Sequence, residues 1–118
     1  MVTVAEAFDL ARSGNREAAA DVLKQEFLRL QSTDQKVELC EWIGNCFESL
    51  NDFEQAADWY EMAGALSLSE RGSPLTNALM ALKHYERALT CHERGDDAEP
   101  VAECLRIIRD LRHVYSAS

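Results

Sequence analysis

The fold of this chain is decided by residues 37–70, VELCEWIGNCFESLNDFEQAADWYEMAGALSLSE. In each half of this stretch, apolar or small residues recur at steps of three and four, which places them on one face of a helix. The two faces consist of Val37, Cys40, Ile43, Gly44, Phe47 and Leu50, and of Phe53, Ala56, Ala57, Tyr60 and Ala63. Between them, Asn51 can act as an N-cap, and Glu54 follows three residues later as in a capping box. We therefore predict two helices that fold back on each other at a tight turn.

Small residues mark the place where these two helices cross. Gly44 and Ala56 fall on facing sides, where they let the two backbones approach. Phe47 and Tyr60 then fill the space around them, because protein interiors are close-packed.

This arrangement resembles a tetratricopeptide repeat, a helix-turn-helix unit of about 34 residues. Two positions depart from the family's pattern, since Cys40 stands where Trp is usual and Leu68 where a closing Pro is usual. The resemblance implies an all-α fold of about six helices in a short right-handed superhelix, and it implies partner binding as the function. The residues that match are Ile43-Gly44-Asn45, Phe47, Asn51-Asp52-Phe53, Ala56, Trp59-Tyr60 and Ala63.

The rest of the chain extends this pattern on both sides. Thr3 opens a capping box and Gly14 breaks the first helix, so the first two helices resemble a degenerate repeat. After Leu66 we expect a polar connection, and Ser73 then caps a new helix that begins at Pro74. We predict one domain, 1–118, made of hairpins at about residues 3–31, 34–67 and 74–116.

The repeat register becomes ambiguous in the last third of the chain. Gly95 can end a helix as a C-terminal glycine, with Asp97 as the next N-cap. In that register Ala88 is the small residue of a repeat, but residues 85–89 also read as the second helix of one. We favour the first register because it leaves a hairpin after Gly95.

Composition bounds the compartment and the class of protein. The chain has 118 residues, 47% hydrophobic and 28% charged, with only five glycines and two prolines, which favours a helical globular domain. It has no apolar run long enough to span a membrane and no recognisable secretory signal, so we expect a cytoplasmic protein. The four cysteines, none in a CxxC pair, are then expected to be reduced.

The histidines and cysteines give one weak metal candidate. Cys91 and His84 are seven residues apart on one helical face, with His92 near its edge. Structural zinc sites usually show closely spaced ligand pairs, which this chain lacks. We therefore predict no metal and no cofactor.

The net charge of −9 argues against nucleic acid and anionic membranes as partners, because both select for clustered Lys and Arg. Residues 37–70 contain eight acidic residues and neither Lys nor Arg. Such a run is either the solvated side of two amphipathic helices or an acidic groove. For catalysis the chain offers neither a phosphate-binding loop nor a set of nucleophile, base and orienting group, so we predict that it is not an enzyme.

The resemblance also implies where a partner binds. Ligands of the family commonly lie along the surface made by the first helix of each repeat, which would here be Glu38, Glu41, Trp42, Asn45, Glu48 and Ser49. The family's clamp for peptide carboxylates uses Lys, Arg and Asn; only Asn45 fits, and Glu41 has the wrong charge. A basic or amphipathic protein segment fits this surface better. Trp42 is either covered by a flanking helix or an exposed anchor of the interface.

These expectations define a non-catalytic interaction module, acting as an adaptor, an assembly factor or a small chaperone. One alternative is a helical ligand-sensing or regulatory subunit that binds a small molecule in its groove. Another is a self-assembling repeat protein, since the end faces of three repeats leave apolar surface to cover. Arg106, Arg109 and Arg112 form a basic edge, which we interpret as a solvated face that complements the helix dipole, the alternative being a surface that meets the acidic middle of a second copy.

Overall fold

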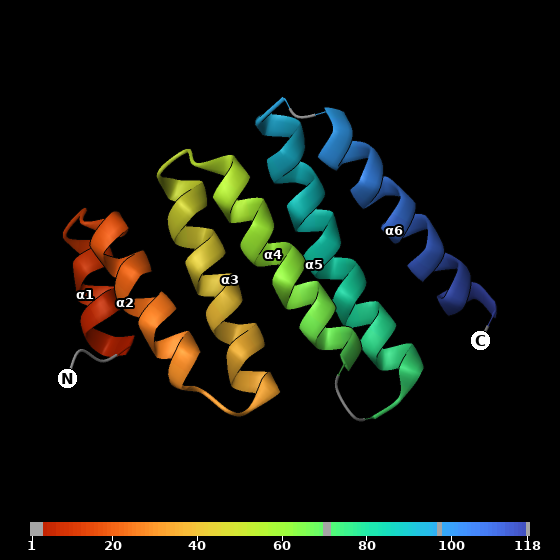
Figure 1. Ribbon diagram of the computed structural model, residues 1–118, viewed down its shortest axis with the longest axis horizontal. Coiled ribbons are helices and arrows are strands. Elements are labelled where there is room, and N and C mark those ends of the chain that lie inside the picture. The colour runs from red at the N-terminus through yellow and green to blue at the C-terminus, as the bar shows by residue number, and fades with distance from the viewer. Residues whose placement is uncertain (1–3, 70–71, 97, 118) are drawn as a thin grey trace.

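The computed structural model describes residues 4–69, 72–96 and 98–117, and it is all-α over these residues, with no strand among them (Figure 1). The predicted all-α class is therefore confirmed. The predicted caps Thr3 and Asp97 lie outside the described residues. The helices are α1 (Val4–Arg12), α2 (Arg16–Arg29), α3 (Thr33–Ser49), α4 (Phe53–Ser69), α5 (Pro74–Arg94) and α6 (Ala98–Ala117).

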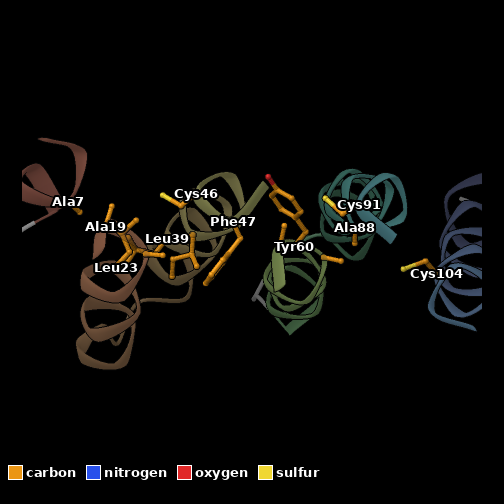
Figure 2. Close-up of a cluster of buried hydrophobic side chains, with 14 residues drawn as sticks. Ala7, Ala19, Leu23, Leu39, Cys46, Phe47, Tyr60, Ala88, Cys91 and Cys104 are labelled. Carbon is orange, nitrogen blue, oxygen red and sulfur yellow. The ribbon is translucent and has the colours of Figure 1, made fainter. Parts of the chain in front are cut away.

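Each helix packs chiefly against its neighbours in the sequence, so the helices form a row from α1 to α6 (Figure 1). Viewed along the helices, α3 and α5 lie in one layer and α2 and α4 in the other (Figure 2). The molecule measures 46 × 34 × 18 Å, and its smallest dimension is about the thickness of two helix layers. None of the described helices is long and apolar enough to cross a membrane.

Two glycine–tyrosine contacts set the spacing of the central helices. A Cβ atom on Gly44 of α3 would lie 2.7 Å from the Tyr60 ring of α4, and one on Gly64 of α4 would lie 2.6 Å from the Tyr85 ring of α5. Both rings are buried, so neither can move aside into solvent. Glycine is required at these two helix crossings because any side chain would overlap an aromatic ring.

The turn between α3 and α4 differs from the predicted one. Asn51 is not the N-cap of α4; it adopts φ +61° and closes α3 by donating its amide to the carbonyl of Glu48. Asp52 is the cap, because its Oδ1 accepts from the amide of Gln55 at 3.3 Å. Asn is one of the few side chains that tolerate the left-handed region, so it ends the first helix and leaves capping to the next residue.

Two further helix ends correct the sequence expectations. Helix α4 continues through Ser69 instead of ending near Leu66. The Ser67 and Ser69 hydroxyls donate to the carbonyls of Ala63 and Leu66, at 2.9 and 2.8 Å, so these polar side chains find partners within the helix. Gly95 does end α5, but with φ −79°, and the left-handed residue of that turn is Asp96 at φ +61°. The predicted N-cap Ser73 and the first-turn Pro74 are confirmed.

Candidate functional site

A line of polar contacts connects α3 to α5. We call it the α3–α5 seam. Its α3 residues face α5 at intervals of three and four, and the α4 tyrosine reaches up between the two helices (Figure 2). The seam consists of Glu41, Asn45 and Glu48 of α3, Tyr60 of α4, and His84, Arg87 and Cys91 of α5.

Tyr60 and Arg87 form the centre of the seam. The Tyr60 hydroxyl lies 2.6 Å from Asn45 Oδ1 and 3.3 Å from Glu48 Oε1. Arg87 Nη2 donates to the same Asn45 oxygen at 2.8 Å and to the Tyr60 hydroxyl at 3.1 Å, while its guanidinium carbon lies 4.6 Å from the centroid of the Tyr60 ring. Burial raises the pKa of Tyr60, which keeps its hydroxyl neutral and available as a donor.

Two carboxylates flank this centre, each beside a buried α5 side chain. Glu41 Oε1 lies 3.3 Å from His84 Nδ1, and burial lowers the pKa of that histidine against the opposing effect of Glu41. Glu48 Oε1 accepts from Cys91 Sγ at 3.3 Å. Burial, followed by the hydrogen bond to Glu48, raises the pKa of the Cys91 thiol to about 12, so at neutral pH this cysteine is protonated and a poor nucleophile.

The sequence-predicted binding residues divide into two groups. Glu41, Asn45 and Glu48 belong to the seam and are engaged with α5. The other three, Glu38, Trp42 and Ser49, lie on the exposed side of α3, and Trp42 is 40% exposed. We call these three residues the outer α3 stripe; at spacings of four and seven they share one helical face.

Sequence reasoning missed the contribution of α5 to this site. Arg87 supplies a cation beside a predicted surface whose charged residues are all acidic, and His84 lies beside Glu41. One signal was present, since residues 84, 87 and 91 are three and four apart and residues 41, 45 and 48 are four and three apart, so each set shares one helical face. The sequence does not indicate that these faces of α3 and α5 contact each other, because the residues that meet, such as Asn45 and Arg87, are 42 positions apart in the chain.

The weak metal candidate that the sequence offered, Cys91 with His84 and His92, does not come together, because each side chain contacts a different carboxylate: Glu48, Glu41 and Glu61 respectively. Among the described residues, the group with metal-binding geometry is Glu61, His92 and Cys104.

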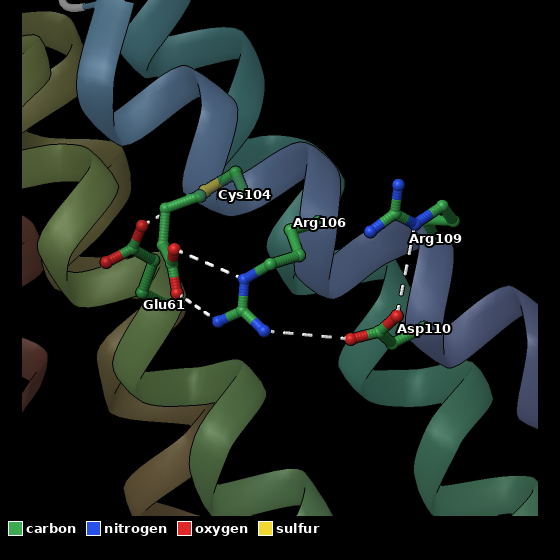
Figure 3. A network of polar contacts seen from close by, with 6 residues as sticks. Glu61, Cys104, Arg106, Arg109 and Asp110 are labelled. Atoms are coloured by element: carbon green, nitrogen blue, oxygen red, sulfur yellow. Dashed lines mark hydrogen bonds and ion pairs between the residues drawn. The ribbon is translucent and has the colours of Figure 1, made fainter.

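The arginine stripe of α6 is neutralised locally. Arg106 pairs with Glu103 and lies 3.8 Å from Asp110, which also approaches Arg109 at 4.0 Å (Figure 3). Arg112 pairs with Glu86 of α5 at 2.9 Å. Each of these arginines has an acidic neighbour in its own chain, so the edge is less basic than its sequence indicates.

No family model, no curated protein and no solved structure matches this chain. The tetratricopeptide resemblance therefore depends on the residues of the chain itself.

Proposed function

We propose that this chain is a non-catalytic interaction module, an adaptor, assembly factor or small chaperone, built as a short tetratricopeptide-type superhelix of three hairpins. Its partner is a basic or amphipathic segment of another protein, bound along the outer α3 stripe beside the seam. The alternation of layers and the glycine–tyrosine crossings support the repeat arrangement. The four free buried cysteines support a reducing compartment such as the cytoplasm.

The observation that carries this proposal is the half-exposed Trp42 one helical turn from the exposed carboxylate of Glu38. Indole side chains are enriched at interface hot spots because they bury a large apolar area with few rotatable bonds. A carboxylate beside the indole selects for Lys or Arg in the incoming segment. The hydrogen bonds of the neighbouring seam hold α3 and α5 at a fixed spacing, which keeps the outer α3 stripe in a fixed position.

The polar groups of the seam favour binding over catalysis. The Cys91 thiol is protonated at neutral pH, because burial and then its hydrogen bond to Glu48 raise its pKa. A nucleophile held in this way lacks the lowered pKa that catalytic cysteines require.

Self-assembly is a second candidate, favoured by exposed apolar side chains near the two ends of the row. Leu28 of α2 is 81% exposed and Leu105 of α6 is 51% exposed. If these ends meet between copies, light scattering will show a mass that rises with concentration, and Leu105→Glu will restore the mass of a monomer. A mass that stays at that of one chain across concentrations would eliminate this candidate.

A synthetic amphipathic peptide rich in Lys and Leu, with a Glu-for-Lys counterpart, tests the interaction proposal. We expect the Lys peptide to shift the indole N–H resonance of Trp42 in the ¹⁵N-labelled chain and to bind more weakly as salt rises. The indole of Trp59 is the internal reference, because its ring packs edge-on against Phe27 at 5.5 Å between centroids. Trp42→Ala should cost about 2 kcal/mol or more of binding free energy.

A matched charge reversal separates the outer α3 stripe from the general acidity of the chain. Glu38→Lys and Asp21→Lys make the same change at exposed positions, the first on the stripe and the second on α2 in the other layer. We expect only Glu38→Lys to slow association of the Lys peptide. Equal effects of the two variants, or an unshifted Trp42 indole, would show that the acidic surface is merely solvated.

A further inference from the structure

Three residues capable of binding a metal converge from the last three helices. Glu61 lies on α4, His92 on α5 and Cys104 on α6. Glu61 Oε1 lies 2.9 Å from His92 Nε2 and accepts from Cys104 Sγ at 3.0 Å, and the ligand atoms of all three residues lie within 4.8 Å of one another. Figure 3 shows Glu61 and Cys104 approaching each other from their separate helices.

Burial makes this cluster different from an ordinary surface ion pair. His92 is 4% exposed and Cys104 is fully buried, whereas Glu61 is partly open to solvent. The buried Nδ1 of His92 has no hydrogen-bond partner among the described residues. A single carboxylate oxygen therefore serves two buried polar groups, and one side of the cluster remains accessible.

We infer that Glu61, His92 and Cys104 form a binding site for a divalent transition-metal ion of the zinc class. Imidazole nitrogen, thiolate sulfur and carboxylate oxygen are the donors that Zn²⁺ takes in proteins, at about 2.0–2.3 Å. Two donors on a tetrahedral ion with these bond lengths lie about 3.3–3.6 Å apart. The two contacts of Glu61 Oε1, at 2.9 and 3.0 Å, are somewhat shorter than this, and the remaining pair of ligand atoms lies within 4.8 Å. Small side-chain rotations therefore bring all three donors into range.

Binding exchanges hydrogen bonds for metal bonds and releases one proton. Without the ion, the Cys104 thiol and the His92 ring share the Glu61 oxygen. With the ion, sulfur binds as thiolate and its proton passes to solvent, while the neutral imidazole binds through Nε2 and carries its hydrogen on Nδ1. The ring keeps one unsatisfied nitrogen in both states, so the exchange costs no additional buried polar group.

Three protein ligands leave the fourth position of a tetrahedral ion open on the side of Glu61. Water or a donor from a bound partner can fill it. Because the ligands come from three helices, the bound ion also holds α6 against α4 and α5. Metal binding should thus stabilise the C-terminal end of the row against unfolding.

Titration of the reduced full chain with Co²⁺ tests this site, because an absorption band from a cobalt–thiolate bond cannot arise from hydrogen bonds alone. We expect a thiolate-to-cobalt charge-transfer absorption that saturates at one ion per chain, is removed by Zn²⁺, and is accompanied by release of one proton per ion. Zn²⁺ should also raise the melting temperature. Absence of a thiolate band at saturating Co²⁺ would overturn the inference, because surface carboxylates bind the ion without sulfur.

The chain provides a matched cysteine control. Cys104→Ser should abolish the thiolate band, whereas Cys91→Ser should leave it unchanged, although the Cys91 thiol is also buried and also donates to a glutamate. Glu61→Gln retains an acceptor for His92 and Cys104 and so preserves the fold; its Co²⁺ affinity should fall by more than the roughly 10- to 100-fold that loss of an outer partner costs. A band that survives in Cys104→Ser, or an unchanged affinity in folded Glu61→Gln, contradicts this assignment.

Discussion

At the scale of single residues, two glycines without side chains decide how closely the central helices approach. Gly44→Ala and Gly64→Ala each place a methyl group within 2.7 Å of a buried tyrosine ring. We expect each change to lower the free energy of unfolding by about 1–3 kcal/mol, as overpacked cores do. Urea denaturation monitored by circular dichroism measures this loss.

Gly95→Ala is the control for this prediction, because a Cβ there has no contact closer than 3.5 Å and φ is −79°. We expect Gly95→Ala to be neutral or to stabilise the chain by about 0.4–1 kcal/mol, since alanine reduces the freedom of the unfolded chain. If Gly44→Ala were as stable as Gly95→Ala, the close approach at Tyr60 would not be what sets the helix spacing.

At the scale of elements, two adjacent polar residues have separate roles in the α3–α4 turn: Asn51 ends α3 and Asp52 caps α4. Asp52→Ala should cost about 0.5–2 kcal/mol because α4 loses its cap, and Asp52→Asn should recover most of that loss. Asn51→Gly should be nearly neutral, whereas Asn51→Val should cost about 1–2 kcal/mol or more because a β-branched residue resists φ +61°. Thermal unfolding ranks the stability of the four variants. A larger loss of stability for Asn51→Gly than for Asp52→Ala would indicate that Asn51, and not Asp52, is the N-cap of α4.

The sequence predicted the helices well, because helices depend on neighbouring residues. It predicted the site poorly, because the site depends on contacts between residues that are far apart in the chain. The spacing of apolar residues and the cap at Ser73 depend on neighbours within a turn or two, so they are visible in the sequence. The choice between Asn51 and Asp52 was missed because both side chains can cap, and only the backbone angle separates them. The Arg87–Asn45 contact joins residues 42 apart, and no local pattern encodes such a distance.

At the scale of the whole molecule, stability should vary along the row of helices. Helix α1 packs chiefly on α2 and α6 chiefly on α5, whereas the central helices are covered on two sides. In such arrays each element depends on its neighbours, so the ends open before the centre. We expect hydrogen exchange to be slowest in α3, α4 and α5 and fastest in α1. Equal protection across all helices in mass spectrometry would instead indicate one cooperative unit.

The neighbour-only packing of the row also has a meaning for the chain while it is being made. A ribosome releases the N-terminus first, and here each new helix meets its packing surface in the helix just released. Most apolar helix faces are therefore buried by a neighbouring helix and not by a distant segment. This shortens the time during which the nascent chain exposes apolar surface that could aggregate. Cys104 follows Glu61 by 43 residues and His92 by 12, so the three-residue cluster is completed only after α6 has emerged.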